Sequence, residues 1–479
     1  VHVRLSTEVE RIDPESIVLR NSDGSSETIP NDAVFTMIGR EAPLDFFRRS
    51  GLRIRGEWRA RTWISLILFL ALCTWLYHWK KGEVGLPIHD AFATRGWFPF
   101  NIGDPADPST FLGTMTLASK SPGFWYSLVY CLCVVGFGVR RIRRRRTPYV
   151  TVQTVTLSLL QVIPLFLLPY LVLPWLGHNG WFDGGIGRTV ADALFPVTEW
   201  DPQGREYWRT FGFVLAWPLF IWNVFTAQPM WTWLIISIVQ TFVIIPLMIR
   251  RWGKGAYCGW ICSCGALAET MGDAHRHKMP HGPGWNRANM IGQVFLLWVL
   301  FLLLLRVALW IHPVRAVGTV YTVLLAGGGA PAWLGEAARY LNYVWFVDVV
   351  WAGILGVGLY FWFSGRVWCR FACPLAALMH IYTRFSRFRI LADKKKCISC
   401  NACTTVCHQG IDVMNFANKG RPMEDPECVR CSACVQTCPT GVLEFGRIDR
   451  RTGAVLGVDR LGASPVRAVE LTVHGRATR

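Results

Sequence analysis

The sequence predicts a mainly α-helical fold: a polytopic bundle of transmembrane helices, preceded by a small β-rich segment and followed by an α+β domain. Three observations predict it. The chain of 479 residues is 52% hydrophobic with 24 Trp, which is too apolar for an ordinary soluble protein. Long apolar runs recur between residues 63 and 363. Eight of the 16 Cys lie at regular intervals between residues 397 and 438.

The first element, residues 1–56, has the alternation of apolar and polar residues that is typical of β-strands. Strands are expected in "VHVRLSTEVERI", in "SIVLRNSDGSSETI" with a turn at Ser22 to Ser25, and in "AVFTMIG". The chain begins at Val1 without a Met or a signal peptide. We therefore expect residues 1–56 to be the remnant of a larger domain with a truncated N-terminus.

The second element, residues 57–390, is expected to be the transmembrane region. Its apolar runs approach the length of about 20 residues that a helix needs to cross a bilayer. They cover residues 63–79, 124–139, 151–176, 211–225, 231–249, 290–311 and 345–363.

The basic residues predict the orientation of these helices. The formal net charge is +18, and Lys and Arg gather in short clusters at residues 59–61, 140–146, 250–254 and 384–389. Such clusters beside apolar runs favour phospholipid headgroups and cytoplasmic loops, and we exclude nucleic acid as a partner. If all clusters share one face, one run between Arg146 and Arg250 does not cross. The short run 211–225, interrupted by Pro218, is expected to be re-entrant or interfacial.

About six transmembrane helices then remain, and loops 80–122, 177–210 and 312–344 face outward. Both chain ends face the cytoplasm. This topology is expected for a multi-pass protein of a bacterial inner membrane.

An internal repeat supports the topology. "YCGWICSCGAL" at residues 257–267 and "WCRFACPLAAL" at residues 368–378 superimpose at an offset of 111 residues. Each copy follows an apolar run, and the single run between them lets both copies point the same way. Both C-x3-C loops are therefore expected on the cytoplasmic face.

The repeat pairs Cys258 with Cys369 and Cys262 with Cys373. These four thiols agree with a further cluster or a thiol relay, and equally with small apolar side chains packed in helix-end loops. The two interpretations stay open at this point.

The cysteines near the C-terminus have a more specific pattern. Cys397, Cys400, Cys403 and Cys407 have the spacing C-x2-C-x2-C-x3-C, and Cys428, Cys431, Cys434 and Cys438 repeat it before Pro439. This is the pattern of bacterial ferredoxins with two clusters, in which the fourth Cys of each run ligates the other cluster. The spacing therefore assigns Cys397, Cys400, Cys403 and Cys438 to the iron of one [4Fe-4S] cluster, and Cys428, Cys431, Cys434 and Cys407 to the other. Zinc, which also accepts four thiolates, is the alternative.

We expect residues 391–446 to form a cytoplasmic ferredoxin-like α+β domain and residues 447–479 to form a basic C-terminal tail. His408 stands where the first run usually has Pro, a change that removes no ligand.

Residues 210–446 resemble the membrane polyferredoxins of the NosR and NapH type. The resemblance lies in "GAYCGWICSCGALAE", "GRVWCRFACPLAALMH" and the double cluster motif. It implies that cytoplasmic clusters and C-x3-C-P loops carry electrons between the quinone pool or a soluble donor and a partner oxidoreductase. The first loop departs from the family, because Ser263 and Cys264 follow Cys262 where the family has Pro.

A second resemblance concerns "NDAVFTMIGREAPLDFF", from Asn31 to Phe47. It is similar to the closing strand of the pyridine-nucleotide domain in thioredoxin-reductase-like flavoproteins. This resemblance implies NAD(P), and less so FAD, only together with a glycine-rich dinucleotide fingerprint N-terminal to Val1.

Together these features predict a membrane-bound iron-sulfur protein that acts as an electron-transferring oxidoreductase component. It would pass electrons, from NAD(P)H in one version, through two [4Fe-4S] clusters to a quinone or a partner oxidoreductase. The alternative is an accessory or regulatory membrane protein of the NosR type that senses redox state or assists maturation of a metalloenzyme.

Overall fold

The computed structural model describes residues 7–21, 23–32, 48–51, 57–81 and 107–462. Its contacts divide the chain into two compact units, Val1–Arg59 and Ala60–Arg479. The described residues are mainly helical, as the sequence predicts.

The N-terminal unit contains a three-stranded antiparallel sheet of order β1-β2-β3. The strands are β1 (Thr7–Ile12), β2 (Ser16–Asn21) and β3 (Ser26–Pro30). They confirm the first two predicted strand regions and the turn between β2 and β3. The third predicted strand, "AVFTMIG", lies outside the described residues.

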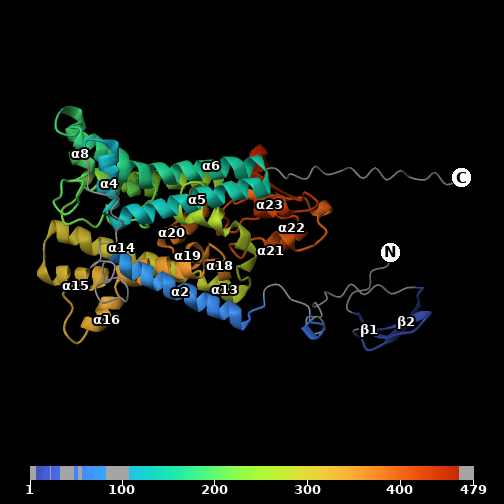
Figure 1. Ribbon diagram of the computed structural model, residues 1–479. Coiled ribbons are helices and arrows are strands. Elements are labelled where there is room, and N and C mark those ends of the chain that lie inside the picture. Colours follow the sequence, from blue (N-terminus) through green and yellow to red (C-terminus); the bar gives the residue numbers. More distant parts are fainter. Residues whose placement is uncertain (1–6, 22, 33–47, 52–56, 82–106, 463–479) are drawn as a thin grey trace. The chain divides into compact units, whose positions relative to one another are not determined.

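Five helices in the described part are long and apolar enough to cross a membrane (Figure 1). They are α2 (Ala60–Lys81), α5 (Pro122–Arg145), α6 (Pro148–Val162) with η1 (Ile163–Val172) and α7 (Leu173–His178), α9 (Trp231–Ile238) with η3 (Val239–Ile244) and α10 (Ile245–Trp252), and α13 (Pro283–Ala288) with α14 (Ile291–Ile311). Between 11% and 39% of their most apolar windows is buried inside the protein. Leu68, Leu132 and Leu297 are among the large apolar side chains that they expose. Because water disfavours an apolar surface of this extent, these helices indicate a membrane protein.

The expectation of a sixth continuous span at residues 345–363 is wrong. η5 (Tyr343–Leu355) and α17 (Gly356–Gly358) form a shorter apolar helix, which ends before α18 (Tyr360–Phe363). A Cβ atom at Gly353 would lie 2.5 Å from Tyr77 of α2, and one at Gly358 would lie 2.5 Å from Leu70. Glycine thus permits close packing against α2, and it also weakens the helix that it interrupts.

Residues 211–225 do not cross the bundle as a helix. The 3-10 helix η2 (Tyr207–Phe213) is followed by turns. Ala216, Trp217 and Ile221 from these turns are buried in the main hydrophobic core. The Tyr257 hydroxyl donates to the Val214 carbonyl at 2.6 Å and accepts from the Ala216 N–H at 2.9 Å, so this irregular segment is tied to the first C-x3-C loop.

The described loops separate to the two ends of the bundle, as Figure 1 shows. One end carries α4 (Phe111–Ser119), α8 (Gly185–Leu194), α15 (Arg315–Ala326) and α16 (Gly335–Tyr340). The other end carries α11 (Gly255–Cys258), α12 (Ser263–Glu269), η4 (Met271–Lys278), α19 (Val367–Phe371), α20 (Pro374–Thr383) and the C-terminal domain. Both C-x3-C loops therefore lie at the end of the bundle that carries the basic ends of α5 and α10.

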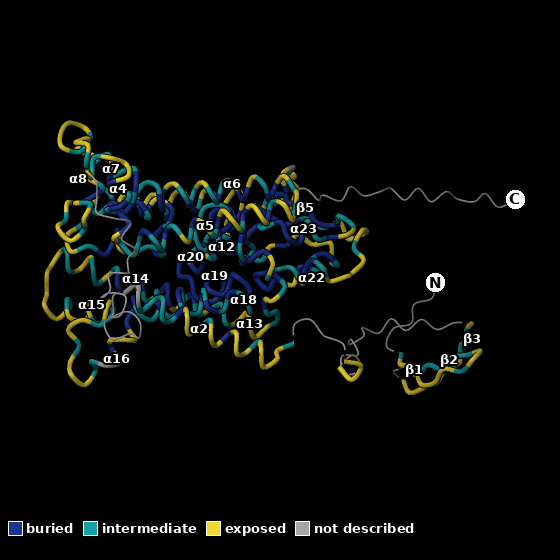
Figure 2. Tube along the Cα trace, viewed as in Figure 1, coloured by how far each residue is buried: buried dark blue, intermediate teal, exposed yellow. Residues whose placement is uncertain are grey.

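The C-terminal domain has the predicted α+β character. Its sheet of order β4-β5-β6 is antiparallel and consists of β4 (Phe388–Ala392), β5 (Leu443–Ile448) and β6 (Val455–Val458). The short helices are η6 (Lys394–Lys396), α21 (Ala402–Thr405), α22 (Val413–Lys419), α23 (Ala433–Thr437) and η7 (Arg460–Gly462). Figure 2 shows that buried residues continue from the bundle into this domain.

Candidate metal centres

Two cavities in the C-terminal domain are lined by the regularly spaced cysteines. Cys397, Cys400, Cys403 and Cys438 line one cavity. Cys407, Cys428, Cys431 and Cys434 line the other. Each cavity thus combines three cysteines of one run with the last cysteine of the other run, which is the arrangement that the spacing predicts. The role of these residues as ligands stays a prediction.

The two runs also have the same unusual backbone. Ser399 and Asn401 flank the second cysteine of the first run with φ of 55° and 59°. Arg430 and Ser432 flank the second cysteine of the other run with φ of 50° and 62°. Non-glycine residues adopt this left-handed conformation at a cost of roughly 1–3 kcal/mol each, and such strain concentrates at functional sites. Turns of this kind direct successive backbone N–H groups toward an anion, as in many iron-sulfur sites.

Burial alone disfavours thiolates at these positions. It raises the pKa of Cys403 to about 11 and the pKa of Cys407 to about 12. A metal that binds thiolate displaces the proton from sulfur, so the cysteines need a cation to become ligands at neutral pH.

The second cavity lies against the bundle. A Cβ atom at Gly255 of α11 would lie 2.1 Å from the Val429 carbonyl oxygen, so the loop that contains Cys428 and Cys431 rests directly on α11. Lys254 Nζ contacts Glu427 Oε2 at 2.7 Å beside this contact. Both partners are buried, and the pair fixes the domain to the end of the bundle.

An aromatic contact reinforces the same interface. The Tyr149 hydroxyl at the start of α6 donates a short hydrogen bond to the Arg430 carbonyl. It accepts one from Trp260 Nε1 at 3.2 Å. Tyr149 also packs edge-to-face on Phe445 of β5, with 5.6 Å between ring centroids.

The sequence gave no indication of a buried charge network beside this cavity. Glu269, at the end of α12, is fully buried and contacts Arg366 at 2.6 Å, Arg141 at 3.1 Å and Arg276 at a shorter distance. Burial alone would raise the pKa of Glu269, but the guanidinium groups of these three residues lower it to about 2. The carboxylate is therefore charged at neutral pH.

His408 belongs to this network. Its ring lies 3.1 Å from Arg276 Nη1, and its Nε2 lies 3.6 Å from Glu269 Oε1. Burial and the neighbouring arginines lower its pKa well below the ordinary value. In the described part of the chain, the donor atoms of Glu269, His408 and Cys431 all lie within 4.8 Å of one another. The sequence signal for His408 was its departure from Pro, whereas Glu269 had none.

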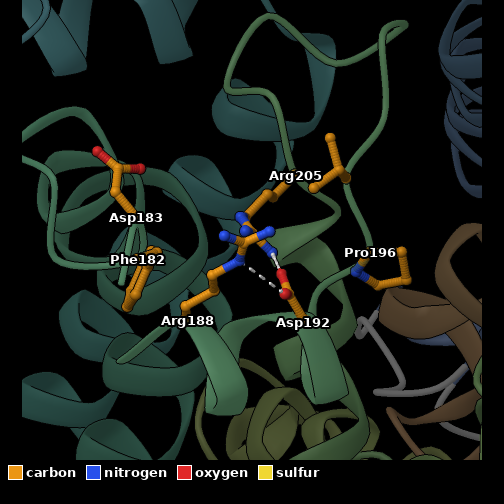
Figure 3. Close-up of a pocket in the computed structure, with 7 residues that line it drawn as sticks. Phe182, Asp183, Arg188, Asp192, Pro196 and Arg205 are labelled. Atoms are coloured by element: carbon orange, nitrogen blue, oxygen red, sulfur yellow. Dashed lines mark ion pairs between the residues drawn. The ribbon is translucent and has the colours of Figure 1, made fainter. Parts of the chain in front are cut away.

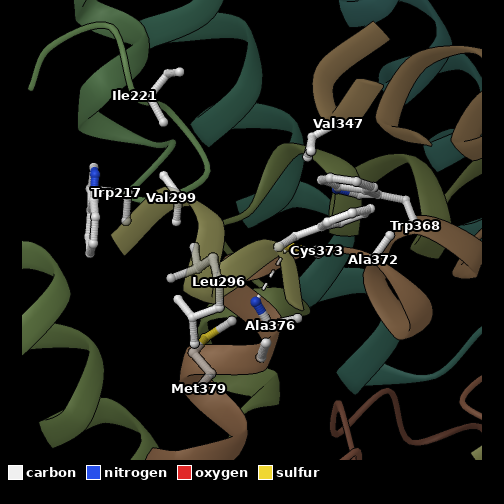
Figure 4. Packing of buried hydrophobic residues seen from close by; sticks show 14 of the residues in the cluster. Trp217, Ile221, Leu296, Val299, Val347, Trp368, Ala372, Cys373, Ala376 and Met379 are labelled. Atoms are coloured by element: carbon white, nitrogen blue, oxygen red, sulfur yellow. Dashed lines mark hydrogen bonds between the residues drawn. The ribbon is translucent and has the colours of Figure 1, made fainter. Parts of the chain in front are cut away.

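The four thiols of the repeat are buried in one core. Cys258, Cys262, Cys369 and Cys373 belong to the main hydrophobic cluster, where Figure 4 shows Cys373 among apolar side chains. All four are free thiols. The structure therefore brings together both pairs that the offset of the repeat relates.

Polar side chains of α5 and α6 hold the first C-x3-C loop. Gln153 Nε2 donates to the Gly259 carbonyl at 2.8 Å, and Gln161 Nε2 donates to the Ile261 carbonyl at 2.7 Å. Because these carbonyls cannot reach water, the two glutamines fix the loop in one conformation.

The second cysteine of each copy is the N-cap residue of a helix. Cys262 precedes α12 and Cys373 precedes α20, and Cys373 Sγ accepts a hydrogen bond from the Ala376 N–H at 3.4 Å. A hydrogen bond from the neighbouring Cys264, opposed by burial, helps to lower the pKa of Cys262 to about 7. Burial raises the pKa of Cys258, and Lys254 opposes that rise.

A surface pocket lies at the opposite end of the bundle (Figure 3). Asp192 in this pocket contacts Arg205 at 2.7 Å and Arg188 at 3.5 Å. The pocket has no thiol among its lining residues, so it does not contribute to the metal centres.

Comparisons with known proteins agree with the cysteine chemistry. A family model described as a 4Fe-4S dicluster domain matches residues 389–439. A model described as a 4Fe-4S binding domain matches twice, at residues 230–280 and 342–391, once over each copy of the repeat. No solved structure matches the chain.

The chain is also similar to curated proteins. YccM of Escherichia coli (strain K12) is 26% identical over 181 residues, which are 37% of this chain and 46% of that protein. The regulatory protein NosR of Stutzerimonas stutzeri is 27% identical over 193 residues, 39% of this chain and 24% of NosR. The ferredoxin-type protein NapH of Haemophilus influenzae is 24% identical over 172 residues, 34% of this chain and 51% of NapH. The chain thus spans between a quarter and about half of these relatives.

The apolar helices, the matched domains and the relatives define a class: a membrane protein with 4Fe-4S domains. Within that class, the chain is similar to the membrane ferredoxin-like proteins of the NosR, NapH, NirI and MauN type. The resemblance of residues 31–47 to a thioredoxin-reductase-like domain stays a prediction, because most of these residues lie outside the described part.

Proposed function

We propose that the protein is a membrane-bound electron-transfer protein that holds two [4Fe-4S] clusters in its C-terminal domain. Cys397, Cys400, Cys403 and Cys438 hold one cluster, and Cys407, Cys428, Cys431 and Cys434 hold the other. The observation that carries the proposal is that each cavity is lined by four cysteines drawn from both runs. The bacterial ferredoxin pattern requires this crossing.

The spacing of the thiols favours a cluster over a single zinc ion. With Zn–S bonds of about 2.3 Å, the sulfurs of a tetrahedral zinc site lie roughly 3.8 Å apart. In the described residues, the one trio of ligating side chains with donor atoms within 4.8 Å is Glu269, His408 and Cys431. The cysteines of each cavity are farther apart, which suits a larger inorganic core.

The buried charges also suit an anionic group. When bound, an iron-sulfur cluster supplies one-electron transfer, and its thiolates bring negative charge into the protein. At this end of the bundle five buried cations face three buried carboxylates. The cations are Arg141, Lys254, Arg276, Arg366 and Arg370, and the carboxylates are Glu269, Asp273 and Glu427. The excess positive charge stabilises thiolates, since an uncompensated buried cation is costly.

The route of the electrons is part of the proposal. They come from a soluble donor and leave to a quinone in the lipid bilayer or to a partner oxidoreductase. NAD(P)H as donor is supported by the resemblance of Asn31–Phe47 alone, and FAD has less support. The basic clusters at residues 140–146 and 250–254 support a position of the C-terminal domain and both chain ends on the cytoplasmic face of a bacterial inner membrane.

A second candidate function is favoured by one relative. NosR is named a regulatory protein. The chain would then use the same clusters to sense redox state or to assist maturation of a metalloenzyme. Turnover separates the two functions: an electron-transfer protein in detergent or liposomes catalyses sustained reduction of a quinone or a dye by a reductant. A regulatory protein is reduced and reoxidised once without turnover.

The cluster assignment is tested by iron and sulfide analysis of anaerobically purified protein. Cys431→Ser and Cys438→Ser remove one sulfur from different cavities, so each variant is expected to lose about four iron atoms and to alter a different part of the reduced-state EPR spectrum. Cys133→Ser, in the middle of α5, is the matched control and keeps the full iron content. Unchanged iron in both ligand variants, or zinc in place of iron, would refute the assignment.

A further inference from the structure

The duplicated C-x3-C loops meet in a way that neither copy requires for its own folding. Cys258 and Cys262 come from the first copy, and Cys369 and Cys373 come from the second copy, 111 residues later. All four are at most 7% exposed and belong to one core cluster. Two pairs of soft ligands from two elements therefore face a common interior, which is the usual construction of a four-thiolate metal site.

Each copy also contributes a buried cation beside these thiols. Lys254 precedes Cys258 by one helical turn, and Arg366 precedes Cys369 by a similar distance along the chain. Arg366 Nη1 donates to the Cys258 carbonyl at 3.3 Å, so the cation of the second copy contacts the loop of the first. Among the described residues, the buried Nε of Arg366 and Nε1 of Trp368 have no hydrogen-bond partner. Such unpaired donors disfavour a core that is filled by neutral thiols alone.

The thiols adjoin the second cavity of the C-terminal domain. Cys431 packs against the same core cluster as the four thiols. Gly255, three residues before Cys258, contacts the Val429 carbonyl two residues before Cys431. The backbone of α11 is thus the only layer between the two sets of cysteines at this contact.

We propose that Cys258, Cys262, Cys369 and Cys373 together form a third metal centre, an iron-sulfur site shared by the two copies of the repeat. This inference rests on the proposed function, because its place is beneath the second ferredoxin cavity. When bound, such a cluster supplies one-electron transfer between that cavity and the bundle. The thiols hold it, the N–H groups at the starts of α12 and α20 stabilise its sulfur ligands, and Lys254 and Arg366 compensate its charge.

Two other uses of the thiols are less consistent with the structure. A resting disulfide disagrees with all four being free thiols. A single zinc ion disagrees with their spacing, because no three cysteines in the described residues have sulfur atoms within 4.8 Å of one another.

The experiment compares the iron content of the full chain, purified anaerobically in detergent, with that of a Cys262→Ser/Cys373→Ser variant. The unaltered chain is expected to contain about twelve iron and twelve sulfide ions, and the variant about one third fewer. Cys264→Ser is the matched control, since Cys264 adjoins Cys262 but has Leu375 as its counterpart in the second copy. It keeps the full content.

Mössbauer spectra of the unaltered, 57Fe-enriched chain give a count that does not depend on folding of a variant. About eight iron ions per chain in two clusters would overturn the third centre and leave the proposed function standing. Loss of iron in Cys264→Ser equal to that in the double variant would also overturn it. Failure of the proposed function gives a different result, namely unchanged iron in Cys431→Ser and Cys438→Ser. A disulfide found between the repeat thiols, with iron unchanged in the double variant, would assign them to thiol chemistry instead.

Discussion

Replacing Glu269 by Gln tests the buried charge network that lies between the bundle and the second cavity. The carboxylate contacts Arg366 at 2.6 Å, Arg141 at 3.1 Å and Arg276 at a shorter distance, and it is fully buried. The variant leaves three guanidinium groups around a neutral amide. Breaking a buried ion pair from one side costs about 3–5 kcal/mol. At about 2 °C per kcal/mol for a large domain, the melting temperature should fall by about 6–10 °C.

The measurement is thermal unfolding of the detergent-solubilised full chain. Asp192→Asn is the control, because Asp192 also contacts an arginine, at 2.7 Å, but its side chain is 48% exposed. An exposed pair contributes about 0–1 kcal/mol, so the control should melt within about 2 °C of the unaltered chain. Equal melting temperatures for the two variants would refute the reasoning.

The pH dependence of this effect has a definite sign. Burial would raise the pKa of Glu269, but the three arginines lower it from the ordinary value of 4.5 to about 2. A carboxylate with a lowered pKa contributes its full stability above about pH 4.5 and loses it as the pH falls toward about 2. The difference between the unaltered chain and Glu269→Gln should therefore be constant across neutral pH. A difference that changed between pH values near 6 and 8 would point to another titrating group.

Three further predictions concern the metal centres. Gly255→Ala places a Cβ 2.1 Å from the Val429 carbonyl and should displace the cysteine loop, altering the EPR spectrum, whereas Gly136→Ala, where nothing lies within 4 Å, should not. Arg276→Gln removes a buried positive charge beside Cys431 and should lower the midpoint potential of that cluster by on the order of 50–100 mV in an EPR-monitored titration. Exposed Lys419→Gln should shift it far less, and equal shifts would contradict the argument. Removal of iron with a chelator should make residues 389–439 sensitive to protease while the apolar helices stay protected, because ligand binding supplies much of the folding free energy of a small metal domain.

The ferredoxin cysteines could be found in the sequence because the ligand geometry of a cluster imposes a local spacing. Cys397 to Cys407 lie within one loop and helix, so the distances along the chain reflect distances in space. The long helices were similarly accessible, since a bilayer requires a continuous apolar run. The short helix from Tyr343 was not, because its length depends on where α2 packs against Gly353 and Gly358.

Glu269 could not be predicted by the same reasoning. In the sequence it follows "GALA", where an acidic residue at a helix end is ordinarily exposed to water. Its partners Arg141 and Arg366 lie 128 residues before it and 97 residues after it. Only the meeting of three separate segments makes this carboxylate a counterion, and no local pattern encodes that meeting.

The offset of the repeat gives this network a further meaning. Glu269 in the first copy corresponds to His380 in the second copy, 111 residues later. Glu269 contacts Arg366, the cation of the second copy. His380 Nδ1 lies 2.7 Å from Glu427, and the same carboxylate contacts Lys254, the cation of the first copy. Each copy's cation is thus neutralised at the equivalent position of the other copy.

The two halves differ in where the carboxylate comes from. In the first copy it belongs to the repeat itself, whereas in the second copy the histidine takes Glu427 from the C-terminal domain. The bundle alone would leave Lys254 buried without a counterion, which is strongly unfavourable. Docking of the C-terminal domain removes that cost, and this is a physical reason why the contacts join residues 60–479 into one compact unit instead of separating the domain from the bundle.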